Sequence, residues 1–213
     1  YGNCVEIRRC AGKKETVLAE DPLEILNKEI QAFKPVQIDD LPKFFCCTVG
    51  YIGYDTIRYC EQLPNIPPDD MLFADIQMMF YDTVIIFDHL IKTIKVVCTA
   101  HIQGDRLENV YEDAIRKIDH LIERLRTPVM FLSDDAPVKG DLQTPFSSNF
   151  EKPAFLTSVD HCKEYIKAGD IFQVVISQRL KTQASAEPFD IYRVLRVLNP
   201  SPYMFYLKMG DVK

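Results

Sequence analysis

Apolar residues recur along the chain with two different periods, which together predict a mixture of strands and helices. Alternating apolar and polar residues indicate half-buried strands, whereas apolar residues repeated every three or four positions indicate helices. The predicted strands span residues 3–10, 15–18, 44–54, 74–81, 83–88, 93–100, 171–180 and 203–207. The predicted helices span residues 22–33, 54–61, 107–126, 153–167 and 188–198.

Local signals mark several of these boundaries. Asp21 is a suitable N-cap for the helix that Pro22 opens. Gly169 can adopt the left-handed conformation that ends the preceding helix, and Asn199-Pro200 stops the helix over 188–198. The connections between residues 74 and 100 are short, so we expect the three strands there to form an antiparallel meander.

Clustered strands with few βαβ repeats favour an α+β fold built on antiparallel sheets. Residues 127–149 contain three prolines and a glycine among Asp and Ser residues, a composition typical of an exposed linker. We therefore divide the chain into a region at 1–126, a linker at 127–149 and a second region at 150–213.

The amino-acid composition limits the kinds of partner and the cellular compartment that we expect for this protein. The net charge is −6 and the pI is near 5.3, so no basic stripe is available for a nucleic acid. The longest apolar runs are too short to cross a bilayer, and no signal peptide is visible. Seven cysteines without C-x-x-C spacing fit buried thiols in a reducing compartment, which favours the cytoplasm.

Two long unbroken segments connect the chain to a known family. They are KAGDIFQVVISQR at 167–179 and NPSPYMFYL at 199–207. Both resemble motifs of anthranilate synthase component I, in the family of chorismate-using enzymes. The resemblance continues through VGYIGYDTIRYCE at 49–61 and YDTVIIFDH at 81–89. It implies a sandwich of antiparallel sheets with helices outside.

The resemblance also implies a truncated fold, because family members continue beyond the position where this chain ends. Region 1–126 then corresponds to the N-terminal part of component I, and 150–213 to an incomplete start of the chorismate-binding region. We expect that these residues alone do not turn over chorismate. We also expect strands 172–180 and 203–208 to lack partners and to expose their edges.

The implied activity is that of a lyase in the first step of tryptophan biosynthesis. Chorismate and ammonia would give anthranilate and pyruvate, with ammonia supplied from glutamine by an amidotransferase subunit, component II. Tryptophan is implied as a feedback inhibitor and Mg²⁺ as the cofactor. The family's metal-binding glutamates and catalytic histidine lie in a segment that this chain does not contain, so we assign no metal ligand here.

Gln173 is the candidate catalytic residue. From the pattern alone it is a polar residue on the solvated face of a strand. Related chorismate enzymes that add water hold a lysine at the matching position, where it can act as a general base. An amide cannot remove a proton at neutral pH but can donate and accept hydrogen bonds. The resemblance therefore implies that Gln173 suits an enzyme that adds ammonia.

The double-proline corner is the second candidate site. Its prolines make it a rigid connection between a helix and a strand. The resemblance implies that it also lines a tryptophan-binding site, for which the candidate residues are Asn199, Pro200, Pro202, Tyr203, Met204 and Phe205. The serine-containing segment that completes this site in the family is absent, so we expect weak or undetectable tryptophan binding by this chain.

Other polar residues receive a structural interpretation. Asp55 and Arg58 are spaced for a salt bridge, and His120 and His161 lie among charges on predicted helices. The acidic pairs at 69–70 and 134–135 suit solvated turns. Two alternative functions stay open: aminodeoxychorismate synthase component I of the folate pathway, and a non-catalytic amino-acid-binding module. A decayed remnant is a third possibility.

Overall fold

A computed structural model describes most of the chain as two compact units. The described residues are 3–9, 12–39, 41–42, 45, 47–102, 104, 106–128, 145–184, 186–210 and 212. Unit 1 comprises Tyr1–Phe131 and unit 2 comprises Leu132–Lys213. The boundary between them falls inside the predicted linker.

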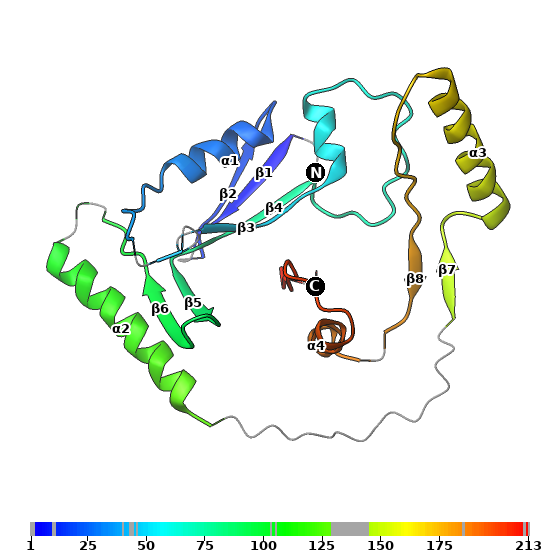
Figure 1. Cartoon of the computed structure of the whole chain (residues 1–213). Helices are drawn as coiled ribbons and strands as arrows, with labels where there is room; N and C mark the ends of the chain where they lie inside the picture. The colour runs from blue at the N-terminus through cyan, green and yellow to red at the C-terminus, as the bar shows by residue number, and fades with distance from the viewer. Residues whose placement is uncertain are drawn as a thin grey trace. The chain divides into compact units, whose positions relative to one another are not determined.

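Unit 1 contains most of the strands. Its elements are β1 (Cys4–Arg8), β2 (Lys14–Leu18), α1 (Pro22–Gln31), β3 (Cys47–Ile52), the 3₁₀ helix η1 (Tyr54–Tyr59), β4 (Ile76–Tyr81), β5 (Thr83–Asp88), β6 (Thr93–Cys98) and α2 (Leu107–Arg126). Figure 1 shows α1 lying along the β1–β2 hairpin and α2 beside β6. The predicted elements of this unit are confirmed in type, and α2 has the predicted bounds.

The first hairpin and α1 form where the sequence signals predict them. β1 and β2 pair antiparallel, with Cys4 opposite Leu18 and Arg8 opposite Lys14. The Asp21 carboxylate accepts a hydrogen bond from the Leu23 backbone N–H at 2.8 Å. This N-cap satisfies one of the backbone donors that a helix leaves open in its first turn.

Of the predicted three-stranded meander over residues 74–100, only the pairing of the second and third strands is confirmed. β4 pairs antiparallel with β3, and β5 pairs antiparallel with β6, so the described strands form two separate ladders here. Only Asp82 separates β4 from β5. One residue cannot reverse the chain into a hairpin, because the shortest common hairpin connections use two. The chain therefore continues from one ladder into the next.

α2 packs against β6 and is tied to the β4–β5 junction. The helix presents an apolar stripe toward the strand and a charged face outward. The Lys117 ammonium pairs with the Asp82 carboxylate, and the Thr99 backbone N–H donates to the Asp82 carbonyl at 2.6 Å. Asp82 thus contacts the end of β6 through its backbone and α2 through its side chain.

Unit 2 contains β7 (Phe146–Ser148), α3 (Lys152–Ala168), β8 (Leu180–Thr182) and α4 (Pro188–Leu198). Both helices confirm the sequence predictions. The interpretation of 127–149 as linker throughout is wrong at its end, because Phe146–Ser148 pairs antiparallel with Leu180–Thr182. Residues 129–144 of the predicted linker, including Asp134 and Asp135, lie outside the described residues.

The predicted strands at 171–180 and 203–207 are wrong in extent. At the end of the segment 171–180, only β8 belongs to a ladder. The segment 203–207 contains no strand. The pairing nearest to it is an isolated antiparallel bridge between Met209 and Val212. A strand is defined by hydrogen bonds to a neighbour. Among the described residues no neighbour is present along Ile171–Ser177 or along 203–207.

Helices with small antiparallel sheets confirm the α+β class. Each described sheet has two strands, and the expected sandwich is not seen among the described residues. The buried large apolar side chains of the described part are Phe45 and Met209. No described helix is both long and apolar enough to cross a membrane.

Candidate functional site

The segment that carries Gln173 begins at a well-formed helix end. Gly169 closes α3 in the left-handed conformation, with φ of 83°. Its backbone N–H donates to the Ile166 carbonyl, and the Asp170 N–H donates to the Tyr165 carbonyl at 3.0 Å. This pair of bonds is the Schellman arrangement, which requires a residue that tolerates positive φ. The prediction for Gly169 is confirmed.

The other end of the segment is fixed by β7. The Asn149 side-chain carbonyl accepts from the Arg179 N–H at 2.8 Å, and the Arg179 carbonyl accepts from the Asn149 N–H at 3.2 Å. The Gln178 amide donates to the Ser148 hydroxyl at 2.8 Å. Because Asn149 uses its side chain as well as its backbone, it extends the β7–β8 ladder by one residue.

Gln173 lies between these two fixed ends and is exposed. Within the described ranges, its side chain makes no hydrogen bond. Nothing in its surroundings changes the chemistry of the amide, which keeps both a donor and an acceptor available to a ligand. Its catalytic role therefore stays a prediction.

The double-proline corner follows directly from the end of α4. Asn199 ends the helix with φ of −139° and ψ of 70°, outside the helical region, as the ring of the following proline requires. The Asn199 N–H donates to the Leu195 carbonyl at 2.9 Å. Beyond the prolines Pro200 and Pro202, Tyr203 and Phe205 are 89% and 76% exposed, whereas Met204 is half-buried.

An aromatic cluster that the sequence analysis did not single out supports this corner. The rings of Phe189 and Tyr192 on α4 lie 6.1 Å apart, and Tyr206 lies 5.2 Å from Phe189 and 5.8 Å from Tyr192. Such ring pairs add attraction beyond area burial. They hold the chain after the corner against α4. In the sequence, the i, i+3 spacing of Phe189 and Tyr192 on a predicted helix was the feature that could have indicated this cluster.

The two candidate sites are separate in the described structure. Among the described residues, no hydrogen bond, ion pair or ring contact joins Gln173 to Asn199–Phe205. Both sites have exposed side chains, and these do not converge on a position where one ligand could contact both. The described residues therefore form two separate exposed surfaces and not a single pocket.

A polar cluster in unit 1 lies within the motif at 49–61. The Tyr59 hydroxyl donates to the Asp75 carboxylate at 2.8 Å. The Asp75 carbonyl accepts from the Gly53 N–H at 2.7 Å and from the Thr56 hydroxyl at 3.3 Å. Burial, followed by the hydrogen bond and charge of Asp75, raises the pKa of Tyr59 to about 12. With this pKa the Tyr59 hydroxyl stays protonated near neutral pH and donates its hydrogen bond to Asp75.

The remaining polar predictions of unit 1 are structural as well. Arg58 forms a salt bridge with Asp55 at 2.7 Å and donates to the Leu63 carbonyl at 2.9 Å, which confirms the structural interpretation. Asp69 accepts from the backbone N–H groups of Met71 and Leu72 in an exposed turn. His120 and His161 are exposed, as predicted.

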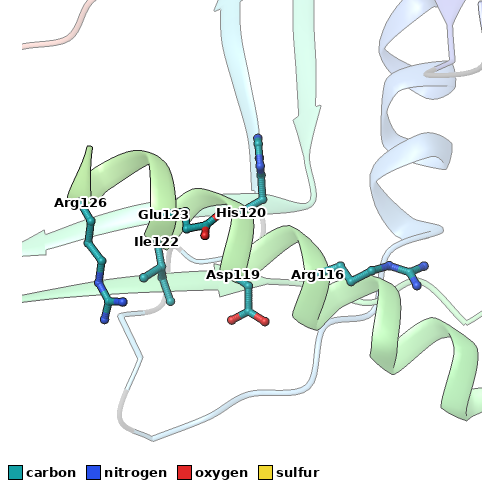
Figure 2. A pocket seen from close by; sticks show the side chains of 6 residues that line it. All are labelled: Arg116, Asp119, His120, Ile122, Glu123 and Arg126. Carbon is teal, nitrogen blue, oxygen red and sulfur yellow. The ribbon is translucent and has the colours of Figure 1, made fainter. Parts of the chain in front are cut away.

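Two cavities lie along α2, and the candidate residues line neither. The larger, of about 520 Å³, is bounded by Arg116, Asp119, His120, Ile122, Glu123 and Arg126. Figure 2 shows these side chains spreading around the helix, with His120 and Asp119 pointing to opposite sides. They do not converge on a common point, so this surface does not resemble a ligand site.

The smaller cavity, of about 210 Å³, lies between α2 and the end of β6. Thr99 is one of the residues that line it, and its hydroxyl oxygen is buried without a hydrogen-bond partner among the described residues. Burial raises the pKa of Asp82, but hydrogen bonds from Lys117 and Thr83 outweigh this, so the pKa lies below its usual value. The cavity is polar and large enough to hold water.

The residues that the structure describes do not form a metal site of the kind that the resemblance implies. Within the described ranges, no three side chains of His, Cys, Asp or Glu gather as a possible metal-binding group. Mg²⁺ prefers several oxygen ligands in octahedral geometry. The described residues do not fit such an ion.

Comparison with known proteins places this fold in a family. The sequence profile of a family described as chorismate binding enzyme matches residues 2–213, and the chain belongs to the chorismate binding enzyme family. It is 39% identical to anthranilate synthase component 1 of Acetivibrio thermocellus over 216 residues, which cover 100% of this chain and 43% of that protein. Its identity to anthranilate synthase component 1 of Thermus thermophilus is 36% over 199 residues, covering 93% of this chain and 40% of that protein.

A solved structure shows the same relationship. Anthranilate synthase component I from Streptococcus pneumoniae TIGR4 matches with a TM-score of 0.73 and 30% identity. The match covers 97% of this chain and 46% of that chain. The chain thus spans less than half the length of these relatives.

Proposed function

We propose that this chain forms part of an anthranilate synthase component I, a lyase that converts chorismate and ammonia into anthranilate and pyruvate. The observation that carries the proposal is the 39% identity to an anthranilate synthase component 1 over the whole of this chain. The relatives named above favour this activity over that of aminodeoxychorismate synthase. The same proposal assigns the chain to the first step of tryptophan biosynthesis.

Gln173 would contact the reacting part of chorismate in this proposal. Its amide can hold a polar group by hydrogen bonds but cannot take a proton from water near neutral pH. Ammonia needs no such activation, because its lone pair is already nucleophilic. An amide at this position therefore favours addition of ammonia over addition of water.

The corner Asn199–Phe205 would bind tryptophan as a feedback inhibitor. Its rigid backbone can present polar groups to an amino acid, and exposed Tyr203 and Phe205 offer rings for stacking on an indole. The aromatic cluster of Phe189, Tyr192 and Tyr206 would keep this corner in place. A ligand bound there needs further contacts from outside the described residues.

The wider assembly follows from the same proposal. The sheets would pack as a sandwich with helices outside, in a cytoplasmic enzyme. A glutamine amidotransferase subunit would supply ammonia, and Mg²⁺ would be held by residues outside this chain, as the resemblance implies.

A chimera tests the activity directly. The matched region of the Acetivibrio thermocellus relative is replaced by this chain, and the product formed from chorismate and ammonium is identified by chromatography. We expect anthranilate, the ortho product. A folded chimera that forms the para isomer, or no aminated product, would overturn the proposal. The unaltered relative assayed in parallel controls for substrate quality.

Gln173→Lys in this chimera tests the proposed role of the amide. We expect anthranilate formation to fall by at least about tenfold and a water-derived product to appear, since a well-placed general base contributes a hundredfold or more. Gln178→Lys is the matched control, because Gln178 bonds to Ser148 at the edge of the ladder. Unchanged products from Gln173→Lys would show that the residue has no part in choosing the nucleophile.

A further inference from the structure

The chain beyond the double-proline corner turns back beside α4 (Figure 1). We call residues 203–209 the return segment. At its start, the Ser201 hydroxyl accepts a hydrogen bond from the Tyr203 backbone N–H at 3.4 Å. At its end, Met209 is 6% exposed and forms the antiparallel bridge with Val212. The return segment is therefore tied at both ends.

The side chains of the return segment alternate between a covered side and an open side. Tyr203 and Phe205 are strongly exposed, whereas Met204 and Tyr206 are half-buried. This is the alternation of an extended chain, in which successive side chains point to opposite sides. The side on which Tyr206 is held therefore also decides the side on which Tyr203 and Phe205 are presented.

Tyr206 is fixed to α4 by two ring contacts. Its ring lies 5.2 Å from that of Phe189, with an angle of 66° between the ring planes, and 5.8 Å from that of Tyr192. Rings at these distances attract each other beyond the effect of area burial. Each pair corresponds to a factor of about 2 to 13 in an equilibrium constant, and the two pairs together to about 5 to 150.

The three rings lie outside both candidate sites. None of them belongs to the proposed tryptophan-binding residues of Asn199–Phe205. Among the described residues, no hydrogen bond, ion pair or ring contact joins them to Gln173. A change in these rings should therefore alter how the corner is held and leave the chemistry at Gln173 unchanged.

We propose that Tyr206, held by Phe189 and Tyr192, is the positioning residue of the tryptophan site and sets the strength of tryptophan inhibition. The three rings keep Tyr203 and Phe205 turned outward, where they can stack on an indole. Tryptophan then binds a surface that is already ordered, and less affinity is lost to ordering on binding. The inference rests on the proposed function and deepens it by naming the contact that regulates the same site.

Tryptophan inhibition of the chimera with the Acetivibrio thermocellus relative tests the proposal. The relative supplies the residues outside this chain that the ligand also needs. In Tyr206→Leu, we expect the tryptophan concentration for half-inhibition to rise at least about fivefold, because both ring pairs are lost. The kcat and the KM for chorismate should each change less than about twofold. Tyr206→Phe keeps the ring and should keep the half-inhibition concentration within about twofold.

Tyr165→Leu is the matched control. Tyr165 lies on α3, is 54% exposed and has no ring contact among the described residues. This substitution should change neither inhibition nor turnover by more than about twofold. If Tyr206→Leu does not fold, Phe189→Leu provides the test, because it removes one ring pair of Tyr206 and should raise the half-inhibition concentration at least about twofold.

Three results would overturn the proposal. The first is an unchanged half-inhibition concentration in the folded Tyr206→Leu or Phe189→Leu chimera. The second is a rise in Tyr206→Phe as large as that in Tyr206→Leu, because the ring would then not be the determinant. The third is a loss of kcat in parallel with the loss of inhibition, which would show that Tyr206 supports the whole fold.

The unaltered chimera separates this inference from the proposed function. A chimera that forms anthranilate without inhibition by tryptophan would refute the proposed inhibitor site, and this inference with it. A chimera that tryptophan inhibits, with Tyr206→Leu equally sensitive, would refute this inference alone. Calorimetric titration with tryptophan makes the same comparison for a chimera that does not turn over chorismate.

Discussion

β3 in unit 1 and Ile171–Ser177 in unit 2 have similar residue types and different structures. Both are rich in β-branched and aromatic residues, and both were predicted as strands. β3 pairs with β4 along its whole length, from Cys47 opposite Tyr81 to Ile52 opposite Ile76. Ile171–Ser177 pairs with nothing in the described structure. The comparison teaches that strand propensity is realised only where a second strand reaches the first.

The close fit of β3 against β4 shows how much a formed pair constrains its sequence. A Cβ atom built on Gly50 would lie 1.9 Å from the Gln77 carbonyl oxygen, which is part of the backbone. A backbone atom cannot move aside as the end of a side chain can. Gly50 is thus required by the pair, whereas the side chains of Ile171–Ser177 meet no such constraint in this structure.

The largest expected effect comes from breaking the formed pair. Gly50→Ala should destabilise the β3–β4 ladder by about 3 kcal/mol, because the ladder must shift to admit the methyl group. Hydrogen exchange of the β4 amides measures this locally. Gly53→Ala is the control, since its Cβ would lie at 3.1 Å from the Asp75 carbonyl oxygen and needs only a small adjustment. Equal effects of the two substitutions would contradict the explanation.

The next effect concerns the polar cluster beside the same ladder. Tyr59→Phe should cost about 2 kcal/mol, because it removes a hydrogen bond to a charged, half-buried carboxylate. Denaturation in urea measures the loss.

This substitution also has a pH signature. The pKa of Tyr59 is raised to about 12 in the folded protein, above about 10 in the unfolded chain. The contribution of Tyr59 is therefore complete below pH 10 and is lost as the pH rises toward 12. The stability difference between the native protein and Tyr59→Phe should shrink over that range. A constant difference would show that Tyr59 does not titrate as described.

A smaller effect is expected at the fixed end of the unpaired strand. Asn149→Ala removes the acceptor of the Arg179 N–H and should destabilise the β7–β8 ladder by about 1 kcal/mol. Exchange of the Arg179 amide reports it. Asn149→Asp keeps the acceptor oxygen and should retain the slow exchange. If Asn149→Asp exchanges as fast as Asn149→Ala, the side-chain bond does not fix this end.

The smallest effect is expected at the exposed ion pair of unit 1. Lys117→Met should cost about 0.2–1 kcal/mol, as is usual for solvent-exposed pairs. The pKa of Asp82 is lowered in the folded protein, so the contribution is present above the unfolded pKa of about 3.9 and is lost as the pH falls through the folded value. Acid denaturation of the two proteins should converge below about pH 4. Loss of the difference in 1 M salt at neutral pH would be a second sign of the pair.

Prediction from the sequence succeeded where the determining interactions are local. α2 has the predicted bounds and the Asp21 cap and the Gly169 terminus were both foreseen, because capping and helical periodicity involve residues a few positions apart. The predicted pairing of β4 with β5 was wrong because a single residue separates these strands, and such a short connection cannot form a hairpin. The periodicity of apolar residues does not take the length of a connection into account.

The site was harder to predict than the fold. The sequence placed Asn199 and the prolines between a helix and a strand. The helix ends there as predicted, but no strand follows at 203–207. The sequence analysis did not reveal that Phe189, Tyr192 and Tyr206 support this corner. Tyr206 lies beyond the corner, so only the turn of the chain brings it to the two rings on α4. Whether Gln173 faces a substrate depends on polypeptide beside the strand, and no pattern within these residues contains that information.

The single residue between β4 and β5 fixes more than a connection. Side chains of a strand alternate between two faces, so the parity of this junction sets which residues of β5 share a side with those of β4. Inserting one residue beside Asp82 would leave the β3–β4 and β5–β6 ladders intact, each with its own register. It would nevertheless exchange inside and outside between them, a defect that neither ladder would reveal when studied alone.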